Sequence, residues 1–344
     1  MKTAIFLLMA GVTSGVAFAD SCARVDPQLS QISQKLAHSA AGAAEQIVQQ
    51  IPQSDSECPG VLLAKARIAA AKGDSEKAAG MFTRYLEVAP DDPQGYAYFA
   101  RLLIDQGEYP RADAISESAI EKGPNDPAAL AVRGQILAMK GDRQKGVELL
   151  TEACKLSPED AQAHFQLGVI YDRAKLRQDA AAQFKKAVVL DPSDARAWDY
   201  LALNLEPLGD IAGASEAYKT GLEVNREGPR FDAFLDYNYG RFLMKQGDLN
   251  ASKVHLDRAV KLVSDMRATW YERARLDLRL QDYQLARKDA EMAASLADPQ
   301  GVIIDLQIYT ILEQIYRRLG ETELANKYAE LVRQTLPPIR GEHH

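Results

Sequence analysis

The 34 residues from Ala161 to Asp194, AQAHFQLGVIYDRAKLRQDAAAQFKKAVVLDPSD, contain the pattern that decides the fold. Small and aromatic residues recur in it at fixed relative positions, namely Leu167 and Gly168 (7 and 8), Tyr171 (11), Ala180 (20), Phe184 (24), Ala187 (27) and Pro192 (32). The spacing returns in five consecutive segments, 59–92, 93–126, 127–160, 161–194 and 195–228. A fixed period of this length indicates a stack of like units, each too small to bury its apolar face alone.

The Gly, Asp and Pro residues at fixed places in each segment predict two helices joined by a tight turn. A Gly ends the first helix with positive φ, and in four of five cases an Asp follows that can cap the second helix, at Gly73-Asp74, Gly107-Glu108, Gly141-Asp142, Gly209-Asp210 and Gly247-Asp248. Asp92-Pro93 and Asp126-Pro127 place a capping carboxylate before a Pro at the first helical position. Alanines mark the close approach of the paired helices, at Ala112, Ala119, Ala180, Ala187 and Ala214.

These signature positions resemble the tetratricopeptide repeat, or TPR, nearly throughout the chain. The resemblance implies an all-α fold, an α-solenoid in which helix-turn-helix pairs stack as a right-handed superhelix. Five repeats are expected in 59–228, and three more divergent ones in 229–340, at 233–266, 267–300 and 306–339 with insertions at 229–232 and 301–305. Pro207 should kink or end the first helix of the fifth repeat early, and together with the insertion at 229–232 it forms either a bend between the five-repeat and three-repeat blocks or a local irregularity.

Residues 1–19 have the layout of a secretory signal peptide. Lys2 precedes an apolar stretch, and Ala17-Phe18-Ala19 forms a cleavage site before Asp20. A membrane anchor is the weaker interpretation because the apolar stretch is short for a bilayer span. The segment therefore predicts a secreted protein, in the periplasm of a bacterial cell, without a membrane span. Residues 341–344 form a tail whose His pair is either native or a tag remnant.

Residues 20–58 are expected to form an N-terminal capping helix pair, a degenerate repeat. Leu29, Ile32 and Leu36 give an apolar stripe for its first helix, and Ala44 and Ile47 belong to its second. Cys22 precedes the first helix and Cys58 follows the second, so both lie at the same end of an antiparallel pair. We predict a disulfide between them, which an oxidising compartment permits. The third cysteine, Cys154, is expected to be a small buried core residue beside Ala153.

Composition and motifs argue against several classes of function. The formal net charge is -7, which gives no support for binding nucleic acid. The five His residues lack the spacing of a helical zinc site, and His164 at relative position 4 is expected to be a packing residue. Motifs for hydrolases, nucleotides and dinucleotides are missing from the sequence, so neither catalysis nor a cofactor is expected.

The candidate site comes from the resemblance. It implies that the concave groove is lined by the first helix of each repeat, at relative positions 2, 5, 6, 9, 12 and 13. Position 9 carries four arginines, and large or polar neighbours accompany them; the candidate residues are Arg67, Tyr98, Arg101, Phe234, Tyr237, Asn238, Arg241, Tyr271 and Arg275. Arginine can hold a carboxylate in a bidentate manner while the rings cover apolar parts of a peptide.

A plainer interpretation of these arginines stays open. Glu272 precedes Arg275 by three residues and Asp105 follows Arg101 by four, so each arginine could simply form a surface helix pair. The Lys-Asn-Asn-Lys-Arg carboxylate clamp of chaperone-binding TPR proteins is also not reproduced, because other residues occupy its places, namely Leu63, Arg67, Tyr98, Ala128 and Val132.

The sequence thus predicts a noncatalytic scaffold or adaptor of the cell envelope that binds a protein or peptide segment in its groove. The alternative is a structural or assembly subunit of an envelope export or polysaccharide machine, which would use its outer face or ends to oligomerise. The sequence leaves the oligomeric state undetermined. An enzyme whose catalytic groups assemble across repeats is the third class considered.

Overall fold

The computed structural model describes residues 22–38, 40–224, 229–298 and 301–335, and these residues form helices without any strand. They divide into two compact units, with the boundary between Asn204 and Leu205. The predicted signal peptide, the chain end after residue 335 with its Leu336-Pro337-Pro338 segment, and the tail at 341–344 lie outside the described residues. Within the described ranges, none of the helices combines the length and apolarity needed to cross a bilayer.

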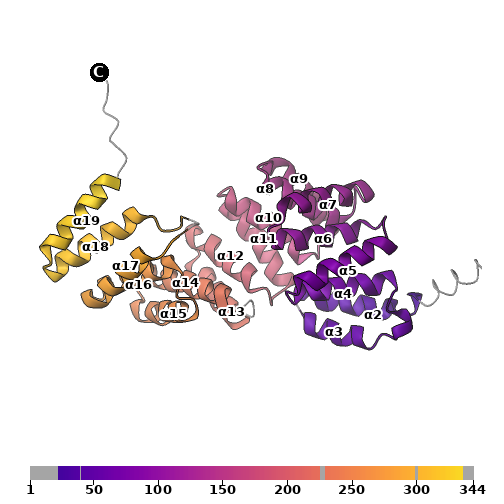
Figure 1. Ribbon diagram of the computed structural model, residues 1–344, viewed down its shortest axis with the longest axis horizontal. Coiled ribbons are helices and arrows are strands. Elements are labelled where there is room, and N and C mark those ends of the chain that lie inside the picture. Colours follow the sequence, from indigo (N-terminus) through magenta and orange to yellow (C-terminus); the bar gives the residue numbers. More distant parts are fainter. Residues whose placement is uncertain (1–21, 39, 225–228, 299–300, 336–344) are drawn as a thin grey trace, which may run out of the picture. The chain divides into compact units, whose positions relative to one another are not determined.

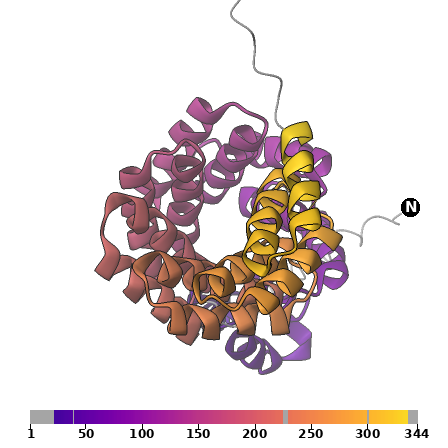
Figure 2. The same ribbon diagram turned by 90° about the vertical axis from the view of Figure 1, so that its left-hand side faces the viewer.

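Each unit is a stack of antiparallel helix pairs (Figure 1). The first unit contains α2 (Asp26–Ala37), α3 (Ala41–Gln49), η1 (Gln53–Asp55), α4 (Pro59–Ala71), α5 (Ser75–Val88), α6 (Pro93–Asp105), α7 (Tyr109–Lys122), α8 (Pro127–Met139), α9 (Arg143–Leu156), α10 (Ala161–Arg173), α11 (Arg177–Leu190) and α12 (Ala195–Leu205), whose last residue begins the second unit. The second contains η2 (Glu206–Leu208), α13 (Ile211–Val224), α14 (Pro229–Gln246), α15 (Leu249–Leu262), α16 (Arg267–Arg279), α17 (Tyr283–Ser295), α18 (Asp305–Leu319) and α19 (Thr322–Thr335). Figure 2 shows the last pair, α18 and α19, side by side in yellow. The predicted all-α solenoid is confirmed.

The turns inside the hairpins have the predicted conformation. Positive φ occurs at all five expected glycines, Gly73, Gly107, Gly141, Gly209 and Gly247. The side chain of Asp74 accepts a hydrogen bond from the Lys77 N–H, as a cap should, whereas Glu108 makes no such bond. Lys175 and Gln281 take the same left-handed conformation without being glycines, at φ 63° and 64°. The hairpin geometry therefore imposes this turn even where the side chain disfavours it.

Small residues let the paired helices approach closely. The five alanines expected at the helix contacts are at most 2% exposed. Gly168 on α10 leaves room for the ring of Phe184 on α11, because a Cβ added there would lie 2.7 Å from that ring. Phe184 in turn lies 5.2 Å from Tyr200 of α12 and 5.7 Å from Phe165 of α10, measured between ring centroids. One aromatic side chain thus joins three helices of the first unit.

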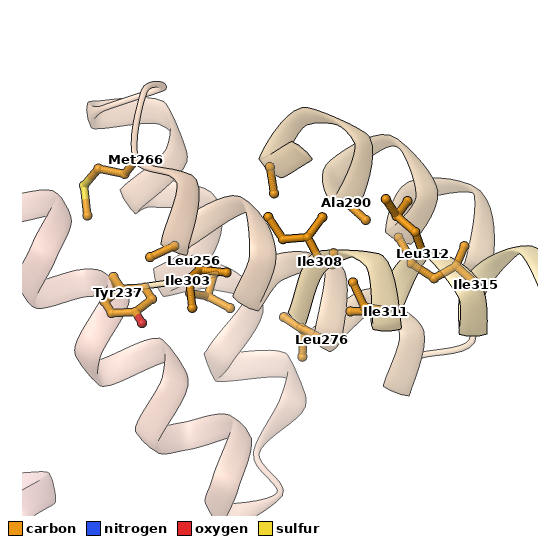
Figure 3. Packing of buried hydrophobic residues seen from close by; sticks show 14 of the residues in the cluster. Tyr237, Leu256, Met266, Leu276, Ala290, Ile303, Ile308, Ile311, Leu312 and Ile315 are labelled. Atoms are coloured by element: carbon orange, nitrogen blue, oxygen red, sulfur yellow. The ribbon is translucent and has the colours of Figure 1, made fainter. Parts of the chain in front are cut away.

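The core of the second unit continues from one hairpin to the next (Figure 3). Leu256 of α15, Leu276 of α16 and Ile308 of α18 are all fully buried in one cluster. Ile303, which precedes α18, belongs to the same cluster. The shared core explains why a single hairpin would not be stable alone.

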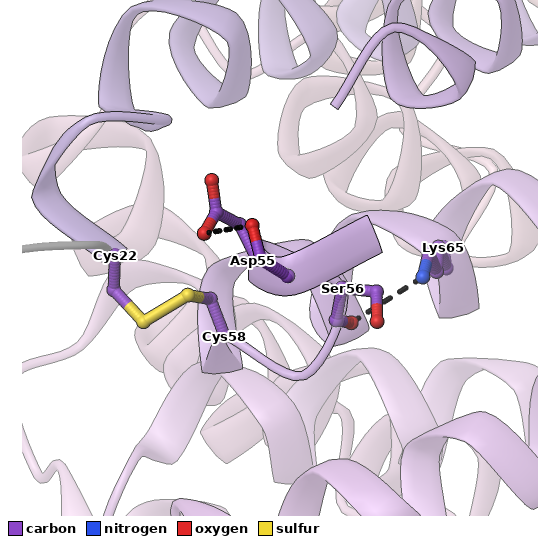
Figure 4. Close-up of a disulfide and its surroundings, with 6 residues drawn as sticks. Cys22, Asp55, Ser56, Cys58 and Lys65 are labelled. Atoms are coloured by element: carbon purple, nitrogen blue, oxygen red, sulfur yellow. Dashed lines mark hydrogen bonds between the residues drawn. A yellow bond between two sulfur atoms is a disulfide. The ribbon is translucent and has the colours of Figure 1, made fainter. Parts of the chain in front are cut away.

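The N-terminal cap is pinned by the predicted disulfide (Figure 4). Cys22 and Cys58 are bonded, which confirms the pairing expected from their places before α2 and after α3. Ile32 of α2 and Ala44 of α3 are buried against α4 as the apolar pattern predicted. Beside the bridge, the ammonium group of Lys65 donates to the carbonyl oxygen of Ser56 at 3.3 Å.

The insertion predicted at 229–232 lengthens a helix, and Pro207 shortens one. Residues 229–232, taken as an insertion, are the first turn of α14, which begins at Pro229 because Pro suits the first helical position. Pro207 does end a helix early, as expected, since α12 stops at Leu205 and η2 follows. The boundary between the two units, after Asn204, lies within the predicted fifth repeat.

Cys154 is less buried than predicted. Its neighbour Ala153 is fully buried, but Cys154 is of intermediate exposure and lines a cavity beside Leu167 and Lys186. A rotation of 100° per residue along α9 carries the thiol away from the helix contact that Ala153 fills. Burial nevertheless raises the pKa of this thiol to about 11, so it is neutral at physiological pH.

Candidate partner-binding surface

The candidate residues lie on the first helix of their hairpins, and within each unit we call the surface that these first helices present the helix A face. In the first unit it comprises Arg67 of α4 with Tyr98 and Arg101 of α6. In the second unit it comprises four candidates on α14 and two on α16, namely Phe234, Tyr237, Asn238, Arg241, Tyr271 and Arg275.

The first unit brings Arg67 and Tyr98 together. The guanidinium carbon of Arg67 lies 4.2 Å from the centroid of the Tyr98 ring. Its Nη1 donates to the hydroxyl of Ser33 on α2 at 3.4 Å. Arg101 lies one helical turn before Asp105 on α6. Burial raises the pKa of the Asp105 carboxyl, although Arg101 and Arg196 pull it down.

The second unit repeats the pairing of arginine and tyrosine on two adjacent helices. The guanidinium carbon of Arg241 is 6.0 Å from the Tyr237 ring centroid, and that of Arg275 is 5.8 Å from the Tyr271 centroid. Phe234 extends the aromatic area, with its ring centroid 5.8 Å from that of Tyr237. Cation–π contacts of this kind hold each guanidinium over a ring without using its N–H donors.

Two carboxylates accompany these cations. Nη1 of Arg275 donates to both oxygens of Glu272, at 2.8 and 3.0 Å, so the helix pair considered from the sequence does form. Glu206 of η2 lies 3.9 Å from Arg241 and also binds the ammonium group of Lys245. The sequence reasoning did not single out Glu206 or Lys245, although they occupy relative positions 12 and 13 of their repeats.

The candidates differ in how much surface they offer. Phe234 is 39% exposed, whereas Tyr237 and Asn238 are 5% and 3% exposed. Burial, and then the nearby charge of Glu272, raises the pKa of Tyr237 to about 12, so its hydroxyl stays protonated. A partner would therefore touch mainly Phe234, Arg241, Tyr271 and Arg275, with Tyr237 and Asn238 supporting them from below.

A second cluster of charges lies between α15, α16 and α17, away from these residues. Arg273 binds both oxygens of Asp289, stacks 4.6 Å from the Trp270 ring centroid, and reaches Asp257 at 3.1 Å. Asp277 is 2% exposed, and Lys253 approaches its carboxylate at 3.4 Å. Burial is the main reason that the pKa of Asp277 rises to about 6; Asp289 adds to the shift, and Lys253 and Arg273 oppose it.

Replacing Asp277 by asparagine is expected to raise the free energy of unfolding of the second unit by about 1–2 kcal/mol at pH 7.5. The folded pKa lies above the ordinary value of 3.8, so the stability from the protonated carboxyl is complete below about pH 4 and lost as pH rises through about 6. Asparagine resembles the protonated form at every pH. Urea unfolding at pH 4.5 and 7.5 measures the difference, which should shrink at the lower pH. An equal gain in the free energy of unfolding at pH 4.5 and 7.5 would contradict a raised pKa for Asp277.

No group of three or more potential metal ligands occurs in the part of the chain that the structure describes. The helix A face therefore offers arginines, aromatic rings and a few carboxylates as its chemical groups. These can hold an extended chain through charge-assisted hydrogen bonds and ring contacts.

Comparisons with known proteins agree with the hairpin architecture. Models of a family described as tetratricopeptide repeat match residues 69–136 and 140–195. No curated protein sequence matches the chain significantly.

Solved structures share the fold at low sequence identity. One is the Cut9–Hcn1 hetero-tetramer of the APC/C, with a TM-score of 0.65, 16% identity and coverage of 88% of this chain and 57% of that one. Human IFIT1, solved as a dimer with PPP-AAAA, has a TM-score of 0.58 and 19% identity over 86% of this chain and 69% of its own. PilW, a type IV pilus biogenesis factor, has a TM-score of 0.54 and 17% identity over 62% of this chain and 95% of its own. The chain thus spans little more than half of the first of these proteins.

Proposed function

Because the chain belongs to the tetratricopeptide-repeat family, we propose that it is a noncatalytic scaffold or adaptor of the cell envelope. It binds a protein or peptide segment in the concave groove that the helix A face lines. TPR folds serve as protein-interaction scaffolds, which supports the general part of this proposal. The signal peptide predicted at residues 1–19 supports secretion, and the Cys22–Cys58 disulfide is compatible with an oxidising compartment.

One observation carries the groove assignment: arginine pairs with tyrosine on the helix A face three times. The pairs are Arg67 with Tyr98, Arg241 with Tyr237, and Arg275 with Tyr271. The side chains of Arg241 and Arg275 are 27% and 42% exposed, so both keep surface that core packing does not use. Arginine and tyrosine are also the residues that interfaces favour.

The double substitution Arg241→Glu with Arg275→Glu is expected to weaken capture of the native partner by at least about tenfold, as losing two charge-assisted contacts would. Crosslinking in the native envelope, followed by pull-down and quantitative mass spectrometry, compares the variant with the wild type. Circular dichroism and thermal unfolding establish that the variant is folded. Unchanged capture by a folded double variant would remove the groove assignment.

A second candidate is an assembly subunit that uses its outer face or ends. One observation on the last described helix favours it: α19 buries Ala325 and stacks Tyr328 on Tyr316 of α18, but leaves Leu324 36% exposed. PilW is described as a pilus biogenesis factor, which is a role of this kind. Light scattering on the purified chain separates the two, since a stable multimer favours assembly and a monomer favours the adaptor.

A further inference from the structure

The helix A face of the second unit carries two matching rows of side chains. On α14 the row is Tyr237, Arg241 and Lys245, and on α16 it is Tyr271, Arg275 and Arg279. Each row advances by four residues, which places its members on one side of the helix. The rows are adjacent, because Arg279 donates from Nη1 to the carbonyl oxygen of Met244 in α14 at 2.8 Å. Both rows run from an aromatic ring to two cations in the same direction along the chain.

The cations outnumber the carboxylates that accompany them. The rows contribute four cations, Arg241, Lys245, Arg275 and Arg279, and the carboxylates that pair with them among the described residues are Glu206 and Glu272. This local excess contrasts with the formal net charge of -7 for the chain. A cationic cluster on an acidic protein attracts anions selectively to one place.

Helix-end effects account for only half of these cations. Lys245 and Arg279 stand in the last turns of their helices, where a cation is favoured by the helix dipole. Arg241 and Arg275 stand in the middle, where that explanation fails. Arg241 is also incompletely satisfied: its Nε is buried without a hydrogen-bond acceptor among the described residues, and Glu206 is 3.9 Å away. Because 27% of the Arg241 side chain is exposed, a ligand oxygen can still bind the accessible part of its guanidinium group.

Aromatic area adjoins the cations at the other end of the rows. Phe234 is 39% exposed and contacts Tyr237, and Tyr271 is half-buried beside Arg275. The hydrogen bond from Arg279 to the Met244 carbonyl oxygen joins the two rows into one cluster. A ligand lying along the rows would therefore meet rings first and cations next.

Building on the proposed function, we infer that the segment bound by the second unit is acidic. Its carboxylate side chains contact Arg241 and Arg275, and an aromatic or apolar side chain packs beside Phe234 and Tyr271. The carboxylates bind the exposed part of the Arg241 side chain, which Glu206 approaches only to 3.9 Å, and add to the bond that Glu272 already makes with Arg275. Because the rings lie at one end of the rows and the cations at the other, the aromatic or apolar side chain of the segment and its carboxylates must follow one another in that order.

A nucleic acid would fit this surface less well than an acidic peptide. Binding a strand requires several phosphates to be neutralised in succession. Here only two arginines stand in mid-helix, and buried Glu272 lies beside one of them. Carboxylates at intervals along a peptide match this small cluster of cations, which Glu206 and Glu272 already neutralise in part, better than a run of phosphates does. Competition by a single-stranded RNA is one of the outcomes that the test distinguishes.

A random dodecapeptide phage library tests the chemistry on the full mature chain. Panning uses the wild type, Arg241→Gln with Arg275→Gln, and the control Lys288→Gln with Arg333→Gln, which removes two exposed cations from α17 and α19. The single variant Arg275→Gln, at a side chain 42% exposed, serves if the double variant does not fold. We expect Asp and Glu to be enriched with the wild type and the control, and this enrichment to disappear with Arg241→Gln and Arg275→Gln.

The best peptide is then synthesised with its acids and, separately, with the matching amides. Fluorescence anisotropy should show the amide form binding at least about tenfold more weakly. Enrichment of basic peptides, no enrichment, or acidic enrichment that survives in the arginine variant would overturn the inference. So would displacement of the acidic peptide by a single-stranded RNA dodecamer at equal concentration. Loss of native capture in the Arg→Glu variant without any acidic preference would refute this inference while leaving the proposed function intact.

Discussion

Replacing Phe184 by alanine is expected to lower the free energy of unfolding of the first unit by about 3–5 kcal/mol. Phe184 is fully buried on α11, and its ring contacts Phe165 and Tyr200 on the neighbouring helices. Its loss leaves a cavity that Gly168 opposite cannot fill, because that residue has no side chain. Urea unfolding followed by circular dichroism at 222 nm measures the change.

Val189 provides the matched control for this substitution. It lies on the same helix but is 71% exposed, so Val189→Ala should change the free energy of unfolding by less than about 0.5 kcal/mol. Equal effects of the two substitutions would contradict the packing described for α10, α11 and α12. A loss below about 1 kcal/mol for Phe184→Ala would mean that the hairpins can close around the missing ring.

Removing the disulfide should have the second large effect. The double substitution Cys22→Ser with Cys58→Ser opens a loop with a sequence separation of 36 residues. Chain-entropy arguments put the cost at about 3–4 kcal/mol. We expect the loss to be concentrated in α2 and α3, because their small apolar cluster holds only a few fully buried side chains. Hydrogen exchange measured by mass spectrometry should show faster exchange there.

Two comparisons complete that experiment. Cys154→Ser removes the free cysteine without touching the bridge and should leave exchange in α2 and α3 unchanged. Exchange in α14 to α17, which belong to the other unit, should be unaffected by either change. Uniform acceleration along the whole chain would indicate that the bridge stabilises more than the cap.

Much of the architecture was predictable because it depends on the spacing of small, aromatic and turn residues along the chain. The period of 34 residues located the hairpins, and the glycines at the turns have the positive φ that was predicted. The packing role of His164 was also correct. Its Nε2 lies 3.2 Å from the Pro158 carbonyl oxygen, six residues back. Trp198 and Trp270 make the equivalent bond at 2.8 Å.

The candidate surface was predictable only in outline. Relative position 9 indicated which arginines share a face, but spacing along one helix says nothing about side chains on the next. The structure shows Arg275 paired with Glu272, while Arg241 keeps an unsatisfied Nε near Glu206. Both are the same residue at the same position of adjacent repeats, and their surroundings differ.

The sequence by itself determined the helical period, the turns, the caps and the disulfide, because each depends on residues at fixed separations along the chain. The tertiary structure alone decided that Lys175 and Gln281 take the left-handed turn conformation without glycine, and that α14 absorbs residues 229–232. It also decided that Glu206 meets the cations of α14. These outcomes depend on how neighbouring helices pack, and packing is set by contacts between residues that local spacing does not relate.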